Sequence, residues 1–123
     1  MKMNSLYVAV KDLERAKTFY ERTIFRQEPS LTTDRFIFFD LNGFLFGLFD
    51  PAMTGEEVRF GNNCVPTLEV ADLETFHQHL RDSGVTIALP LQEVNETVIF
   101  QCLDSEGNVL EFYRWQTSPF QQA

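Results

Sequence analysis

Cysteine and histidine are the most versatile side chains for catalysis and metal binding, and this sequence has two of each. Cys64 and Cys102 lie in different predicted elements and lack the Cys-x-x-Cys spacing of metal and redox sites. His77 and His79 fall within one predicted helix, without a local Ser-His-Asp or Cys-His arrangement. There is no glycine-rich phosphate loop. We therefore expect the cysteines to be reduced thiols, and no recognised catalytic motif stands out.

Charge is distributed unevenly along the chain of 123 residues, which carries a formal net charge of −8. Residues 1–49 have seven basic and six acidic side chains, whereas residues 50–123 have three and twelve. Nucleic acids and anionic membranes attract clustered lysine and arginine, so neither is expected as a partner. The acidic second half favours a cationic ligand, or it is a solvated surface that aids solubility.

Phenylalanine is unusually frequent, with 13 residues against one tryptophan and three tyrosines. So much aromatic surface predicts either a dense core or an aromatic-lined cavity. No signal peptide is evident at the N-terminus, and no apolar run approaches the roughly 20 residues of a membrane span. We expect a cytoplasmic protein.

An internal repeat is the most informative feature of the sequence. Residues 6–14 read LYVAVKDLE and residues 66–74 read PTLEVADLE, so Val-x-Asp-Leu-Glu recurs 60 positions later. In each copy, alternating apolar residues predict a strand with one buried face. Asp12 and Asp72 then stand where a helix N-cap belongs, and Gly84 is placed to end the second helix.

Three further strands are predicted after each helix, so each half reads β-α-β-β-β. Asn42-Gly43 is a strong hairpin signal between two of them. The predicted strands are 25–32, 34–41 and 44–49 in the first half, and 86–93, 97–103 and 109–115 in the second.

These elements predict an α+β fold of two βαβββ modules, 1–49 and 64–123, joined by a linker at 50–63 within one compact domain. A single module leaves one face of its sheet bare. Two modules side by side can curl their mixed sheets into a cup with the helices outside. The concave face is where a ligand pocket is expected. Because the helices lie outside, His77 and His79 are expected to be surface or packing residues.

Two segments carry a resemblance to a known family. Residues 10–20 (VKDLERAKTFY) are similar to the first strand–helix junction of the vicinal-oxygen-chelate superfamily, and residues 104–113 (DSEGNVLEFY) resemble its closing motif. This superfamily includes glyoxalase I, extradiol dioxygenases, and bleomycin- and fosfomycin-resistance proteins. The resemblance covers residues 4–115 and implies the glyoxalase/bleomycin-resistance-type fold. That fold hosts lyases, epimerases, oxygenases and proteins that only bind.

The resemblance also implies four metal-ligand positions, one on the first and one on the last strand of each module. They fall here at Ser5, Gly47, Val65 and Glu111. Of these four residues, only Glu111 binds divalent metals well. Since a catalytic metal normally needs about three protein ligands, we expect no metal and no other cofactor.

Five residues are the candidate ligand contacts. Tyr7, Phe49, Tyr113 and Trp115 share the side-chain parity of the family metal positions, which places them with Glu111 on the concave face. Such rings could stack a planar ligand or hold a cation, or they could simply fill the cup. Glu111 could bind a ligand or act as a general base, or it could pair with an internal arginine or tyrosine.

Three functions remain open from the sequence. The leading hypothesis is a metal-independent protein that sequesters an aromatic or cationic small molecule in the cup. The alternative is a lyase, isomerase or dioxygenase that uses Glu111 as metal ligand or general base. A third possibility is an interaction domain with a filled cup. Family members often pair chains, so we also expect a homodimer.

Overall fold

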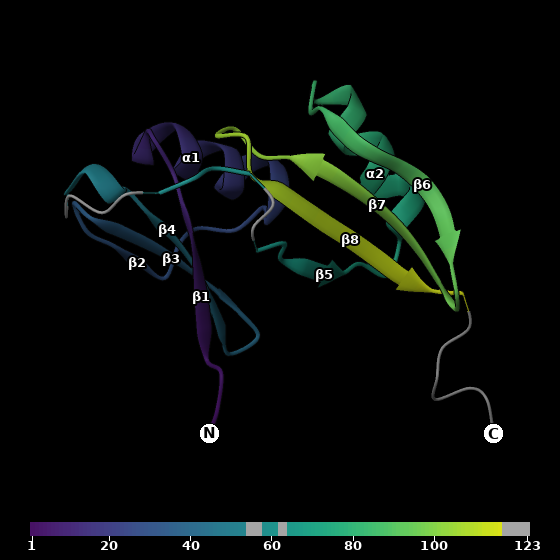
Figure 1. The fold of residues 1–123 in the computed structure, drawn as a ribbon, viewed down its shortest axis with the longest axis horizontal. Coiled ribbons are helices and arrows are strands. Elements are labelled where there is room, and N and C mark those ends of the chain that lie inside the picture. The colour runs from purple at the N-terminus through teal and green to yellow at the C-terminus, as the bar shows by residue number, and fades with distance from the viewer. Residues whose placement is uncertain (54–57, 62–63, 117–123) are drawn as a thin grey trace. The chain divides into compact units, whose positions relative to one another are not determined.

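The structure is a computed structural model that describes residues 1–53, 58–61 and 64–116. The chain divides into two compact units, Met1–Phe60 and Gly61–Ala123. Each unit holds one β-α-β-β-β module (Figure 1). The boundary between the units falls inside the predicted linker 50–63, of which residues 54–57 and 62–63 lie outside the described residues.

The first module is a four-stranded mixed sheet with one helix on it. Its strands run in the order β1-β4-β3-β2, with β1 parallel to β4 and the other pairs antiparallel. Helix α1 contacts β3 and β4. The elements are β1 (Ser5–Ala9), α1 (Leu13–Phe19), the π-helical turn η1 (Tyr20–Ile24), β2 (Leu31–Thr32), β3 (Phe36–Leu41), β4 (Phe44–Phe49) and the 3₁₀ turn η2 (Pro51–Met53).

The second module repeats this plan. Its sheet has the order β5-β8-β7-β6, with β5 parallel to β8 and the other pairs antiparallel. Helix α2 contacts β8. The elements are β5 (Thr67–Glu69), α2 (Leu73–Asp82), β6 (Ile87–Val94), β7 (Thr97–Leu103) and β8 (Val109–Trp115). The predicted fold class, two βαβββ modules with mixed sheets, is confirmed.

The predicted helix and turn signals are largely found. Asp12 caps α1, and its Oδ1 accepts a hydrogen bond from the Arg15 amide at 3.0 Å. Asp72 holds the same position before α2, but its side chain makes no capping hydrogen bond. Gly84 follows α2 with φ of +79°, the left-handed conformation that ends many helices. Within the described ranges, neither helix has the length and apolarity that a membrane crossing requires.

Each core lies between the sheet and its helix. In β8, Leu110 and Phe112 are 0% and 1% exposed because they point toward α2, where Phe112 meets Phe76 at 4.9 Å between ring centroids. Tyr20 is fully buried in the first module and packs on Phe46 at 5.2 Å. Alternation along each strand therefore buries one face under a helix and leaves the other face free of helices.

The predicted strand at 25–32 is wrong over most of its length. Helix α1 continues through η1 only to Ile24, where the Phe25 amide donates to the Tyr20 carbonyl at 2.8 Å, and residues 25–30 form neither helix nor strand. This path buries Tyr20 and lets Phe25 pack against Phe39 and Phe46 at 5.0 and 5.2 Å. Arg26 then adopts a φ of 53° and turns the chain, so only β2 remains to pair with β3.

Candidate functional site

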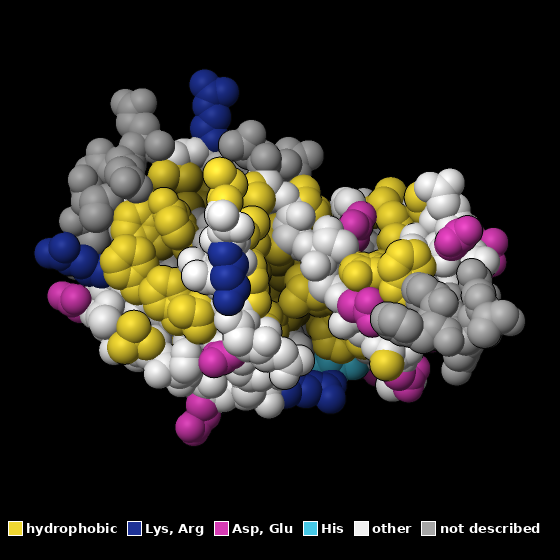
Figure 2. Space-filling model, turned by 90° about the horizontal axis from the view of Figure 1, so that it is seen from below, with side chains coloured by type: hydrophobic (Ala, Val, Ile, Leu, Met, Phe, Trp, Pro, Cys, Tyr) yellow, Lys and Arg dark blue, Asp and Glu magenta, His cyan; other side chains and the backbone are white. Residues whose placement is uncertain are grey.

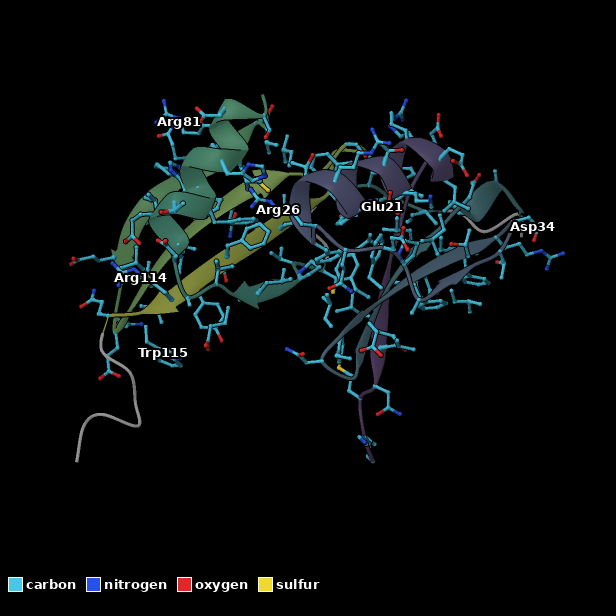
Figure 3. The ribbon with its side chains drawn as sticks, turned by 180° about the vertical axis from the view of Figure 1, so that it is seen from behind. Glu21, Arg26, Asp34, Arg81, Arg114 and Trp115 are labelled. Carbon is cyan, nitrogen blue, oxygen red and sulfur yellow. The ribbon has the colours of Figure 1, made fainter. Side chains whose placement is uncertain are left out.

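The helix-free face of the second sheet carries several polar and aromatic side chains. Its alternation places Glu111, Tyr113 and Trp115 of β8 on the side opposite to Leu110 and Phe112. Trp115 lies with Arg114 at the end of β8 (Figure 3). Three of the five predicted ligand residues therefore share one face. The face comprises Thr67, Glu69, Ile99, Gln101, Glu111, Tyr113 and Trp115.

Glu111 is held by its two neighbours across the sheet. Thr67 of β5 donates its hydroxyl to Oε2 at 3.0 Å, and Gln101 of β7 donates Nε2 to Oε1 at 3.1 Å. Both are the register partners of Glu111 on the adjacent strands. These partners are neutral donors, rather than the arginine or tyrosine that the sequence suggested as an alternative. A carboxylate fixed in this way lies across three strands and keeps further lone pairs for a ligand.

Glu69, Tyr113 and Trp115 form a second polar cluster on this face, which we term the aromatic corner. The Tyr113 hydroxyl and the Trp115 Nε1 both donate to Oε1 of Glu69, at 3.3 and 3.2 Å. The two rings stand at 87° to each other with centroids 6.0 Å apart. Burial raises the pKa of Tyr113, and the negative charge and hydrogen bond of Glu69 raise it further.

A bidentate ion pair fixes the end of β8 to α2. Arg114 donates Nη2 and Nε to Oε1 of Glu74 at 2.6 and 2.8 Å, and Nε also reaches Oε2 at 3.0 Å. The hydrogen bond from Arg114 lowers the pKa of Glu74, and the same bond raises the pKa of Arg114. Arg114 points away from the helix-free face, so its pairing steadies the strand that carries Tyr113 and Trp115.

The helix-free face of the first sheet is aromatic. The predicted ligand residues Tyr7 and Phe49 lie together there, with ring centroids 5.3 Å apart, and Phe36 stacks on Phe49 at 5.0 Å. Tyr7 is 56% exposed, whereas Phe49 is only 3% exposed beneath its neighbours. Figure 2 shows hydrophobic side chains gathered on this module, in the left half of the view. The face can offer ring surface to a ligand but little polar anchoring.

The four metal positions implied by the resemblance hold a poor donor set. Gly47 pairs with Tyr7 in the sheet, and the Phe38 ring lies over it, with Cε1 2.6 Å from where a Cβ would stand. Ser5 begins β1, and Val65 precedes β5 without any ligand atom in its side chain. In the described parts of the chain, no group of three or more His, Cys, Asp or Glu side chains is arranged so that it could hold a metal ion. These residues do not fit a divalent metal that needs about three protein ligands.

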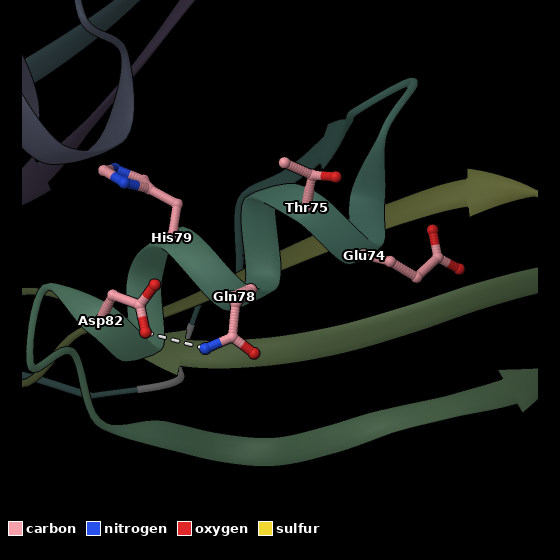
Figure 4. Close-up of a pocket in the computed structure, with 5 residues that line it drawn as sticks. All are labelled: Glu74, Thr75, Gln78, His79 and Asp82. Carbon is pink, nitrogen blue, oxygen red and sulfur yellow. Dashed lines mark hydrogen bonds between the residues drawn. The ribbon is translucent and has the colours of Figure 1, made fainter.

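Helix α2 carries the two histidines away from this face. His77 packs edge-on against Phe100 with centroids 4.8 Å apart, and burial, aided by the charge of Arg81, lowers its pKa. His79 borders a shallow hollow on the outer side of α2 (Figure 4). The hollow is lined by Glu74, Thr75, Gln78, His79 and Asp82. Its carboxylates are engaged, since Glu74 binds Arg114 and Asp82 accepts from Gln78 at 2.8 Å.

Sequence reasoning did not identify Thr67, Gln101 or the role of Glu69. The signal for Gln101 was present, because the turn at residues 104–108 sets Leu103 opposite Val109 and therefore Gln101 opposite Glu111. Thr67 and Glu69 follow only from the parallel register of β5 on β8. A parallel register is not fixed by a hairpin turn, so the sequence offered no local signal for it.

Comparison with known proteins agrees with this architecture. A sequence model of the Glyoxalase/Bleomycin resistance protein/Dioxygenase superfamily matches residues 2–112. No match was found among curated proteins. Among solved structures, a conserved domain protein superposes with a TM-score of 0.80 at 20% identity, covering 94% of this chain and 99% of that one.

Two further solved structures are similar over nearly their whole length. A glyoxalase-related enzyme from Fulvimarina pelagi has a TM-score of 0.76 at 19% identity, with 92% of this chain and 87% of that one covered. Lactoylglutathione lyase from Agrobacterium tumefaciens has a TM-score of 0.76 at 16% identity, with 92% of each chain covered. Identities this low establish the shared fold alone. The family match over residues 2–112 shows that the chain belongs to the Glyoxalase/Bleomycin resistance protein/Dioxygenase superfamily.

Proposed function

We propose that this protein binds a small organic molecule without a metal ion and sequesters it rather than transforming it. The ligand contacts the helix-free face of the second sheet through Glu111, Tyr113 and Trp115. On the first module, Tyr7 offers exposed ring surface, with Phe49 packed against it. The ligand class is an aromatic or cationic compound.

The relationship between Phe38 and Gly47 carries the metal-independent part of this proposal. A family-type ligand at position 47 needs a Cβ, and that atom would stand 2.6 Å from Cε1 of Phe38 and 3.1 Å from Cβ of Tyr7. The space for a coordinating side chain is thus filled by a ring. Glu111 remains as a single carboxylate, which is two ligands short of the about three that a catalytic metal normally has.

Charge on the second module supports a cationic ligand. Its helix-free face carries Glu69 and Glu111, and no lysine or arginine belongs to that face in the described residues. A carboxylate beside exposed rings favours cations and repels anions. Aromatic compounds are favoured by the same rings through stacking.

Thermal unfolding with a ligand panel tests the proposal. Planar aromatic, organic cationic and neutral aliphatic compounds are added in the presence of a chelator. A true ligand at 100 times its Kd should stabilise the fold by about 2.7 kcal/mol. Glu111→Gln should weaken that ligand about tenfold, the loss of one charge-assisted contact, whereas Asp82→Asn on the outer side of α2 should not.

Three outcomes would contradict the proposal. Near-stoichiometric metal that Glu111→Gln releases would indicate a metalloenzyme. Turnover of a bound compound without metal would indicate an enzyme that uses Glu111 as a base. The lack of stabilisation by any compound would favour an interaction domain.

We also propose that the protein is a homodimer, as is common in this superfamily. Sedimentation equilibrium of the full chain measures the mass directly. A mass of 14.3 kDa across the accessible concentrations would show a monomer instead.

A further inference from the structure

We propose that the aromatic corner of Glu69, Tyr113 and Trp115 recognises a quaternary ammonium group on a small organic cation. This inference rests on the proposed function, because it assigns a chemical class to the ligand of the same sheet face. It also makes Glu69, and not only Glu111, a determinant of ligand choice.

The geometry of the two rings is suited to such a group. Tyr113 and Trp115 stand at 87° with centroids 6.0 Å apart, an edge-to-face contact that keeps the two rings nearly perpendicular. Trp115 is 38% exposed, which leaves ring surface open to solvent. Cations are attracted to the faces of tryptophan and tyrosine, and quaternary ammonium groups are commonly held between such rings.

The hydrogen bonds of Glu69 favour a quaternary group over a primary amine. Oε1 of Glu69 already accepts from both the Tyr113 hydroxyl and the Trp115 Nε1, so Oε2 is the main acceptor that this carboxylate keeps for a ligand. A primary ammonium has three N–H donors that need acceptors when it leaves water. A quaternary ammonium has none, so it loses no hydrogen bonds in the corner and still benefits from the carboxylate charge.

The electrostatics of the second module point the same way. Residues 61–123 contain nine acidic side chains and two arginines, a formal charge of −7. Arg114 is engaged by Glu74, and Arg81 lies on α2. Neither arginine belongs to the helix-free face, so no cation of the module is placed to compete with a ligand for Glu69.

The corner is also held in place before any ligand arrives. Tyr113 pairs with Glu69 on β5 and with Ile99 on β7, and Trp115 pairs with Thr97. The Arg114–Glu74 pair fixes the intervening residue of β8 to α2. A preorganised site loses less conformational entropy on binding.

The single tryptophan of the sequence makes the test specific. Trp115 is the only source of an indole N–H resonance, so this resonance reports directly on the corner. The full chain is titrated with choline, with its neutral isostere 3,3-dimethylbutan-1-ol, and with ethanolamine. Choline should shift the resonance saturably, and the other two compounds should bind about tenfold more weakly or worse, the difference expected for one cation–π contact.

Variants separate the corner from the rest of the face. Glu69→Gln keeps the shape of the side chain and removes its charge, so choline affinity should fall about tenfold. The matched control Asp82→Asn removes one negative charge from the outer side of α2 and should leave choline affinity unchanged. The comparison of choline with its neutral isostere needs no substitution, so the test holds even if a variant fails to fold.

The outcomes distinguish this inference from the proposed function. Equal binding of choline and its isostere, or the lack of a saturable shift, overturns the assignment of the aromatic corner to quaternary ammonium. The proposed function still stands in that case if another compound of the panel stabilises the fold through Glu111. If no compound stabilises the fold, both proposals fail. Co-sedimentation with phosphatidylcholine vesicles would overturn the assignment to a small free molecule, and we expect none.

Discussion

The ring of Phe38 lies over the main chain of Gly47 on the helix-free face of the first sheet. A Cβ at position 47 would stand 2.6 Å from Cε1 and 3.0 Å from Cδ1 of that ring, and the first distance is shorter than real Cβ atoms show. The Phe38 ring therefore occupies the space that a ligand side chain would need at this family metal position. Restoring a ligand residue here requires that the ring move or be removed.

Gly47→Ala is expected to lower the free energy of unfolding by about 1–2 kcal/mol, because overpacking outweighs the gain from a less flexible unfolded chain. Phe38→Ala should remove most of that cost, since the overlap disappears with the ring. A double-mutant cycle measured by denaturant unfolding gives the coupling energy, expected above about 0.5 kcal/mol.

Phe36→Ala is the control for this cycle, because Phe36 is a neighbouring ring of the same face but contributes none of the three atoms nearest to a Cβ at position 47. It should not relieve Gly47→Ala. Additive effects of Gly47→Ala and Phe38→Ala would show that the ring turns aside at no cost.

Glu74→Gln is expected to destabilise the second module in a pH-dependent way. Its hydrogen bond from Arg114 lowers the pKa of Glu74 below the ordinary 4.5, so the unfolded chain takes up the proton first. The stabilisation is present above pH 4.5 and is lost as the pH falls through the folded pKa. The effect should be smaller than that of Gly47→Ala, because the two side chains are 30% and 51% exposed.

Denaturant unfolding of the wild type and Glu74→Gln across the acidic range measures this difference. Added salt should also shrink it, since both partners reach solvent. A difference between the two proteins that persists unchanged below the folded pKa would assign the effect to packing instead of charge.

His77→Gln is expected to flatten the stability profile near neutral pH. Burial, helped by Arg81, lowers the pKa of His77 below 6.5, so the unfolded chain is protonated before the folded chain. His77 therefore contributes stability above pH 6.5, which is lost as the pH falls through the folded pKa. Thermal unfolding from about pH 7.5 to about pH 5.5 measures the slope. A slope that the substitution leaves unchanged would show that another group titrates there.

Much of the fold could be predicted from the sequence because its signals are local. The repeated Val-x-Asp-Leu-Glu gave the duplication, and strands 44–49, 97–103 and 109–115 were predicted with the bounds that β4, β7 and β8 have. The strand at 25–32 was wrong over most of its length because the helix runs on to Ile24 and buries Tyr20, and the chain then turns at Arg26. That outcome depends on packing against Phe39 and Phe46, which local periodicity does not report.

The candidate site was predictable in its parity but not in its contacts. Strand alternation predicted that Tyr7, Phe49, Glu111, Tyr113 and Trp115 share one side-chain parity, and each lies on the helix-free face of its own sheet. Their role as ligand contacts stays a prediction. Their partners depend on register between β5 and β8, which are separated by some 40 residues. The hydrogen bonds from Tyr113 and Trp115 to Glu69 therefore could not be predicted from the sequence and are seen only in the structure.

The two cysteines are expected to differ sharply in reactivity toward a thiol reagent. Cys64 is exposed, whereas Cys102 is 0% exposed in the core of the second module, and burial raises the pKa of Cys102 to about 12. The thiolate is the reacting form, so Cys102 should react only when the module opens.

In the Cys64→Ser variant, labelling of the native protein should be slower than labelling in denaturant by a factor of about 10³ or more, the ratio of folded to unfolded molecules in an ordinary domain. The Cys102→Ser variant is the counterpart and should label rapidly without denaturant. Fast labelling of native Cys64→Ser would mean that α2 separates readily from the sheet. That result would contradict the complete burial of Leu73, Leu80 and Phe100 in the core of the same module.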